Sequence, residues 1–176
     1  MQPEPRALRW LLVALGLLSL ALPCRADELP EYRLKAAFLY NFALFTEWPA
    51  DVGATLNLCI HGSNPFGHEI DGLEGKAAGA RSIAVQRKGA GESLAGCQLV
   101  FIAPASIAQL PRVLEALRGR AVLTVADSPG AAHRGVALNM AVAQNKITFE
   151  ANLHAARGAG LNLSSKLLRL ATEVQQ

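Results

Sequence analysis

The chain has 176 residues, of which 51% are hydrophobic and 18% are charged, and its formal net charge is +3 at pH 7. Its densest basic cluster is the pair Arg87–Lys88, so the sequence lacks the clustered positive charge that nucleic-acid-binding proteins carry. A chain of this length is expected to form one domain with a proper hydrophobic core.

The first 26 residues have the three parts of a secretory signal peptide. Arg6 and Arg9 precede an apolar run of 13 residues, 10–22, and small side chains occupy the −3 and −1 positions of a cleavage site after Ala26. Because the run is shorter than the roughly 20 residues of a transmembrane helix, we expect cleavage rather than an uncleaved anchor. Residues 27–176 would then form an exported domain with 14 basic and 13 acidic side chains.

Removal of the signal peptide leaves two cysteines, Cys59 and Cys97. An even pair in an oxidising compartment is typical of a disulfide, which would restrict the unfolded chain by about 4 kcal/mol. The alternative is a pair of buried thiols that act as small apolar side chains.

The first predicted element is a helix over 31–48, which ends there because a residue before a proline is pushed out of the α region. Successive positions differ by about 100° around a helix, and four apolar side chains with Asn41 at their centre share one face. We expect Asn41 to be satisfied by a structural hydrogen bond; a role in the register of a self-association or partner contact is the alternative. The four apolar residues are Leu34, Phe38, Phe45 and Trp48.

The same helix is apolar on its other sides, where Leu39, Tyr40 and Phe42 point. A surface helix of a monomer is not normally apolar most of the way round. We therefore predict that these three residues form an exposed partner or dimer contact.

The remaining elements alternate between strands and helices and end in a hairpin followed by helices. This order predicts an α/β fold, a three-layer sandwich with a mostly parallel sheet and a C-terminal hairpin plus helices. The predicted strands are 55–61, 81–87, 97–103, 121–126, 136–143 and 147–150, with the hairpin turn at 144–146; the predicted helices are a short one opening near 63–65, 106–117, one capped by Asn152 that stops at Gly158, and one from Asn162 to Val174.

The sequence contains none of the common catalytic motifs. The phosphate-binding loop, the dinucleotide-binding glycine pattern, the nucleophile elbow and the Cys-x-x-Cys pair are all missing, and the four histidines lack the spacing of metal ligands. We therefore predict no catalytic residues, no metal, no cofactor and no enzymatic activity.

The loop from His61 to Gly67 follows the first predicted strand, at the edge where open α/β sheets hold ligands. One interpretation is a small-molecule site formed by His61, Ser63 and Asn64. The favoured alternative is a helix start, with Ser63 or Asn64 as the N-cap and Pro65 in the first turn.

Several stretches of the chain resemble the YfiR family. They cover nearly all of the expected mature chain, and the first and last are the more specific. They are Glu31-Tyr32-Arg33-Leu34-Lys35-Ala36-Ala37-Phe38-Leu39-Tyr40-Asn41-Phe42 with Glu47-Trp48-Pro49, Cys59-Ile60-His61-Gly62 with Asn64-Pro65-Phe66-Gly67, Val122-Leu123-Thr124-Val125-Ala126-Asp127, Ile147-Thr148-Phe149-Glu150-Ala151-Asn152-Leu153, and Ala159-Gly160-Leu161-Asn162-Leu163-Ser164-Ser165-Lys166-Leu167-Leu168.

The resemblance implies a periplasmic, typically dimeric repressor that acts on the periplasmic sensor part of a membrane diguanylate cyclase and lowers cyclic di-GMP and biofilm formation. It also implies an outer-membrane lipoprotein as a second partner, and it pairs Cys59 with Cys97. The family's second disulfide has no counterpart, because no cysteine follows Cys97. The alternative function is a periplasmic small-ligand receptor that signals to a histidine kinase or another membrane sensor.

Overall fold

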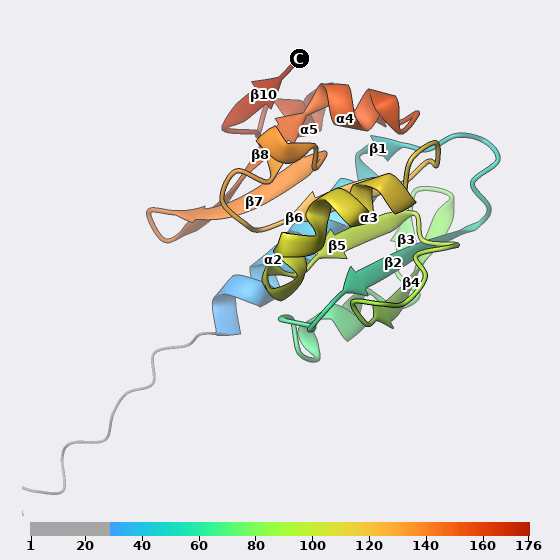
Figure 1. Ribbon diagram of the computed structural model, residues 1–176, viewed down its shortest axis with the longest axis horizontal. Helices are drawn as coiled ribbons and strands as arrows, with labels where there is room; N and C mark the ends of the chain where they lie inside the picture. Colours follow the sequence, from blue (N-terminus) through green and yellow to red (C-terminus); the bar gives the residue numbers. More distant parts are fainter. Residues whose placement is uncertain (1–28) are drawn as a thin grey trace, which may run out of the picture.

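The computed structural model describes residues 29–176, and it describes the exposure of side chains from residue 31 onward (Figure 1). The predicted signal peptide, 1–26, lies outside the described residues. Within the part of the chain that the structure describes, no helix is both long enough and apolar enough to cross a membrane.

Helices and strands alternate along the chain, as predicted. The helices are α2 (Leu29–Leu44), α3 (Leu110–Ala116), α4 (Leu153–Gly158) and α5 (Ser165–Leu168), with short 3₁₀ helices η2 (Glu69–Leu73), η3 (Pro104–Gln109) and η4 (Ala132–Arg134). The strands are β1 (Thr46–Glu47), β2 (Thr55–His61), β3 (Ala77–Ala78), β4 (Arg81–Lys88), β5 (Leu99–Ile102), β6 (Leu123–Ala126), β7 (Leu138–Ala143), β8 (Lys146–Asn152), β9 (Asn162–Leu163) and β10 (Glu173–Gln175).

One eight-stranded sheet in the order β10-β8-β7-β6-β5-β2-β4-β3 forms the centre of the domain. Neighbouring strands from β7 through β6, β5 and β2 to β4 are parallel, whereas β7 pairs antiparallel with β8 and β3 pairs antiparallel with β4. This arrangement confirms the predicted α/β fold with a mostly parallel sheet and a C-terminal hairpin.

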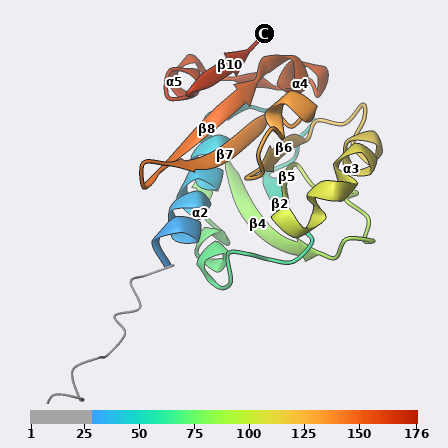
Figure 2. The ribbon, with the colours of Figure 1, turned by 60° about the vertical axis from the view of Figure 1, so that its left-hand side comes forward.

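Helices cover both faces of the sheet, and Figure 2 shows α2 and α3 on opposite sides of β2 and β5. Strand β5 contributes side chains to both hydrophobic cores, because successive residues of a strand point to opposite faces of the sheet. Leu99 and Phe101 pack in the cluster that contains the buried face of α2, while Val100 and Ile102 pack in the cluster that contains α3. The continuous apolar run of this strand is therefore explained by burial on both faces.

The first helix ends at Leu44, four residues earlier than predicted. The Thr46 hydroxyl donates a hydrogen bond to the Phe42 carbonyl at 2.7 Å, and the next residues form β1, which pairs antiparallel with β9. Pro49 disfavours the α conformation at Trp48 and so predicts the latest residue at which the helix should end. The helix ends earlier than this because the residues after it pair with β9.

The hairpin prediction is confirmed. In the β7–β8 pair Ala143 lies opposite Lys146, so the loop consists of Gln144 and Asn145, which have φ values of 50° and 61°. Two consecutive residues with positive φ match the twist of the flanking strands.

The C-terminal predictions are partly correct. Asn152 caps α4, and its side chain accepts a hydrogen bond from the Ala155 amide at 2.8 Å. The single helix predicted over 162–174 is wrong: that segment forms β9, the short helix α5 capped by Ser164, and β10, which pairs parallel with β8.

The helix predicted to open near 63–65 is also wrong. Turns occupy 65–68, and the 3₁₀ helix η2 begins only at Glu69. Asn64 instead closes a local turn, because its side-chain oxygen accepts from the Phe66 amide at 3.0 Å and its side-chain nitrogen donates to the Gly67 carbonyl at 2.8 Å.

Candidate functional site

The three residues predicted as a contact surface lie mostly inside the protein. Leu39 and Phe42 are fully buried, and the Phe42 ring packs edge to face on Phe149 with 5.1 Å between ring centroids. Tyr40 is half-buried, and its hydroxyl donates to the Ala77 carbonyl at 2.9 Å. The expectation that Leu39 and Phe42 form an exposed apolar surface is wrong, and a contact through Tyr40 stays a prediction.

The opposite face of α2 is the exposed one. Leu34 is 48% exposed and Leu44 is 37% exposed, and Phe38 and Phe45 are only partly buried. Asn41 is exposed, and its side chain makes no hydrogen bond to another described residue, so the predicted structural hydrogen bond is wrong; its role in a partner or self-association contact stays a prediction. We call Leu34, Phe38, Asn41 and Leu44, with Phe45 directly after the helix, the outer face of α2. Leu34, Asn41 and Leu44 are exposed, whereas Phe38 and Phe45 are partly buried, and the Phe38 ring packs edge to face on Phe149 of β8 with 6.1 Å between ring centroids.

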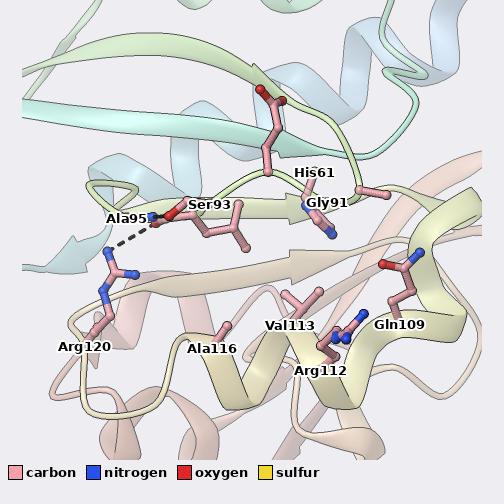
Figure 3. A pocket seen from close by; sticks show the side chains of 12 residues that line it. His61, Gly91, Ser93, Ala95, Gln109, Arg112, Val113, Ala116 and Arg120 are labelled. Carbon is pink, nitrogen blue, oxygen red and sulfur yellow. Dashed lines mark hydrogen bonds between the residues drawn. The ribbon is translucent and has the colours of Figure 1, made fainter.

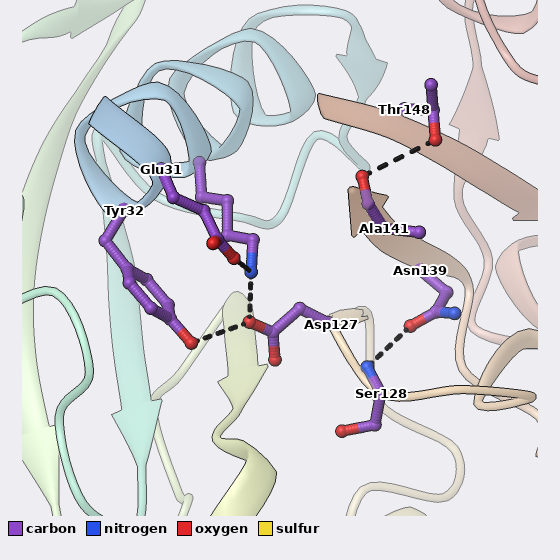
Figure 4. Close-up of polar contacts among 8 residues, drawn as sticks. Glu31, Tyr32, Asp127, Ser128, Asn139, Ala141 and Thr148 are labelled. Carbon is purple, nitrogen blue, oxygen red and sulfur yellow. Dashed lines mark hydrogen bonds and ion pairs between the residues drawn. The ribbon is translucent and has the colours of Figure 1, made fainter. Parts of the chain in front are cut away.

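The inner face of α2 carries a buried ion pair that was not predicted from the sequence (Figure 4). The Lys35 ammonium donates to Oδ2 of Asp127 at 2.7 Å, and the side chains are 5% and 1% exposed. The Tyr32 hydroxyl donates to the same oxygen at 3.1 Å, and Glu31, which is more exposed, contacts Lys35 from the other side. Asp127 directly follows β6, so this cluster joins α2 to the carboxyl end of a central strand.

The cluster holds Lys35 in its charged form. Burial lowers the pKa of Lys35, but hydrogen bonds to Asp127 and Glu31 outweigh burial, and the pKa lies above its ordinary value of 10.5. Burial, followed by the negative charge of Asp127, raises the pKa of the Tyr32 hydroxyl. Both groups therefore keep their protons at neutral pH, and the arrangement fits an anchor for the helix rather than a proton-transfer site.

A signal for this pair was present in the sequence. Asp127 stands immediately after the apolar run 121–126, and Lys35 is a charged residue within an apolar helix. Charged side chains are seldom fully buried unless they are paired, so each of these positions pointed to a partner. The partner itself lies 92 residues away in the sequence, which periodicity cannot reveal.

The structure brings the two cysteines together in a disulfide. Cys59 on β2 and Cys97 just before β5 have Cα atoms 5.9 Å apart, within the range that a disulfide requires. Both are buried on the α3 side of the sheet, where the bridge links β2 to the segment that precedes β5.

The residues of the predicted ligand loop do not converge. His61 is 2% exposed and neither of its ring nitrogens has a hydrogen-bond partner among the described residues, whereas Ser63 is exposed and Asn64 closes its turn. Gly62 adopts φ +98°, and a Cβ there would lie 2.0 Å from the Ser106 hydroxyl oxygen. The backbone directly after His61 therefore passes too close to Ser106 for any residue other than glycine.

No group of three or more His, Cys, Asp or Glu side chains within residues 29–176 is arranged to hold a metal ion.

A sequence model of the YfiR/HmsC-like family matches residues 32–172. The chain belongs to this family. The matched range includes Tyr32, Lys35 and Asp127 of the buried cluster, both cysteines and His61. The family is regulatory rather than catalytic and acts in diguanylate cyclase signalling from the periplasm. No curated protein matches the chain.

Proposed function

We propose that this chain is a periplasmic regulator that binds the sensor part of a membrane diguanylate cyclase and represses it. Cyclic di-GMP and biofilm formation would fall as a result. The observation that carries the proposal is the family match over 32–172. A homodimer and an outer-membrane lipoprotein as a second partner belong to the same proposal.

Repression from outside the membrane requires selective binding. The regulator must bind one conformation of the sensor domain more tightly than another, because a ligand with equal affinity for both conformations shifts no equilibrium. A binding surface is therefore required, and a catalytic centre is not.

The outer face of α2 is the surface that we assign to this contact. Its exposed apolar residues are Leu34 and Leu44, which are 48% and 37% exposed. Phe38 and Phe45 pack against the core but are only partly buried, so each keeps part of its ring accessible. Apolar and aromatic side chains at the centre of a protein interface often supply most of the binding energy.

Intracellular cyclic di-GMP in the source bacterium tests the proposal. Deletion of the gene should raise cyclic di-GMP, and the exported wild-type protein should lower it again. Leu34→Glu should fail to lower it while unfolding at the same urea concentration as the wild type. Leu170→Glu is the matched control, because Leu170 is 71% exposed and lies outside α2; this variant should repress normally.

An unchanged level of cyclic di-GMP on deletion, in cells that express a neighbouring cyclase, would refute the repressor function. Normal repression by Leu34→Glu would refute the assignment of the surface alone. The ligand-receptor alternative stays a prediction, and the positions of Ser63 and Asn64 do not favour it.

A further inference from the structure

A pocket of about 440 Å³ lies on the α3 side of the sheet, away from α2. Figure 3 shows its three walls: the carboxyl end of β2 at His61, the loop 90–95, and the helical segment that contains Gln109, Arg112 and Val113. This volume is within the range of small-molecule sites in proteins.

His61 supplies the pocket with hydrogen-bonding groups that the protein does not use. The side chain lines the pocket, is 2% exposed, and both of its ring nitrogens are without a partner in the described part of the chain. Most buried polar groups in native proteins are hydrogen-bonded, and an exception calls for an explanation. Burial lowers the pKa of His61 below its ordinary value of 6.5, so at neutral pH the ring presents one donor and one acceptor.

Arg112 gives the pocket a positive charge. It is exposed on α3 and forms no ion pair with any described residue. A second lining arginine, Arg120, donates to the Leu94 carbonyl at 3.2 Å and so holds the loop in place. Glu92 also lines the pocket, and its carboxylate accepts a hydrogen bond from the Gly89 amide within its own loop. It keeps its negative charge, so the charged residues of the lining are two arginines and one glutamate.

The disulfide holds two walls of this pocket together. Cys59 lies two residues before His61 on the same face of β2, and Cys97 lies two residues after Ala95, which ends the lining loop. The wall that carries the histidine and the wall formed by the loop are therefore covalently linked, and a preorganised pocket loses less entropy when a ligand binds.

We propose that this pocket binds a small organic anion, whose carboxylate or phosphate group pairs with Arg112 and whose polar atoms meet the ring of His61. Guanidinium groups bind both kinds of oxyanion through charge-assisted hydrogen bonds. The site is separate from the outer face of α2 and would add a small-molecule input to the regulator. It does not depend on the proposed repression.

The test is a titration of the mature, oxidised protein, 27–176, followed by NMR of the His61 ring. Citrate supplies carboxylates, glycerol 3-phosphate supplies a phosphate, and glycerol is the uncharged probe. We expect saturable shifts of the His61 resonances with one of the anions and none with glycerol. The anion that binds identifies the class of charged group.

Two variants make the test specific. Arg112→Gln should weaken binding at least tenfold, whereas Arg118→Gln, in the turn after α3 and outside the pocket lining, should bind as the wild type does. His61→Phe should abolish binding but should not lower the melting temperature, because the phenyl ring fills the site without unpaired nitrogens.

Three results would overturn the proposal. The first is the absence of His61 shifts with both anions up to 10 mM, a concentration at which even a site with a dissociation constant of about 1 mM is largely filled. The second is equal affinity of Arg112→Gln and the wild type for the anion. The third is binding of glycerol as tight as that of the anions. None of them would bear on repression of the cyclase, which cyclic di-GMP measures separately.

Discussion

Replacing Lys35 by methionine tests whether the buried ion pair anchors α2 to the sheet. Methionine keeps the length of the apolar stem but leaves the 1% exposed carboxylate of Asp127 with the Tyr32 hydroxyl as its only remaining side-chain partner among the described residues. Removing one partner of a buried pair typically destabilises a protein by about 3–5 kcal/mol, because the other charge stays buried and uncompensated. We expect Lys35→Met to lower the free energy of unfolding by about that amount.

Urea unfolding followed by tryptophan fluorescence, with the disulfide intact, measures this change. Glu31→Gln is the matched control: its carboxylate contacts the same ammonium group but is 43% exposed. The loss for this variant should stay below about 1 kcal/mol, as for exposed ion pairs. The double variant Lys35→Met/Asp127→Asn should be more stable than Lys35→Met alone, because it no longer leaves a full charge buried.

If Lys35→Met is no less stable than Glu31→Gln, the ion pair does not anchor α2. In that case the apolar contacts of Leu39 and Phe42 would hold α2 by themselves, and the ion pair would be energetically neutral.

Two further predictions concern the disulfide and the buried histidine. Cys97→Ser opens the loop closed by residues 38 apart in sequence and should lower the free energy of unfolding by about 4 kcal/mol in the chain-entropy model; equal urea midpoints for the oxidised and reduced wild-type protein would contradict this. Since burial lowers the pKa of His61, the unfolded chain binds a proton more readily than the folded one. The contribution of His61 is therefore present above about pH 6.5 and is lost as the pH falls toward the folded-state pKa. Melting temperatures from pH 8 to pH 5 should fall less steeply for His61→Phe than for the wild type, and parallel profiles would show that His61 does not titrate this way.

Local features of the sequence determined most of the sheet. The predicted strand over 55–61 has the same bounds as β2, because alternation and apolar runs report burial on one face or both. The Asn152 cap and the turn at Gln144 and Asn145 were also predictable, since both depend on bonds or φ angles within a few residues.

The orientation of α2 was decided by the tertiary structure. Both faces of this helix are apolar, so a period of 3.6 residues predicts a helix without showing which face is buried. The structure buries Leu39 and Phe42 and leaves Leu34 exposed; only on the buried face can Lys35 reach Asp127. The buried face thus includes a contact with a carboxylate 92 residues away, which the period of the helix cannot indicate.

The C-terminal segment and the pocket depend on distant contacts in the same way. Residues 173–175 form a strand because β8 offers a free edge, although by themselves they continue a helical pattern. The sequence suggested a ligand residue at His61, but its partners were predicted at Ser63 and Asn64. Alternation along β2 instead points His61 to the same face as Cys59, where it lines a pocket together with Arg112 and the 90–95 loop. Local pattern determined which elements form, and packing between distant segments decided which surfaces they expose.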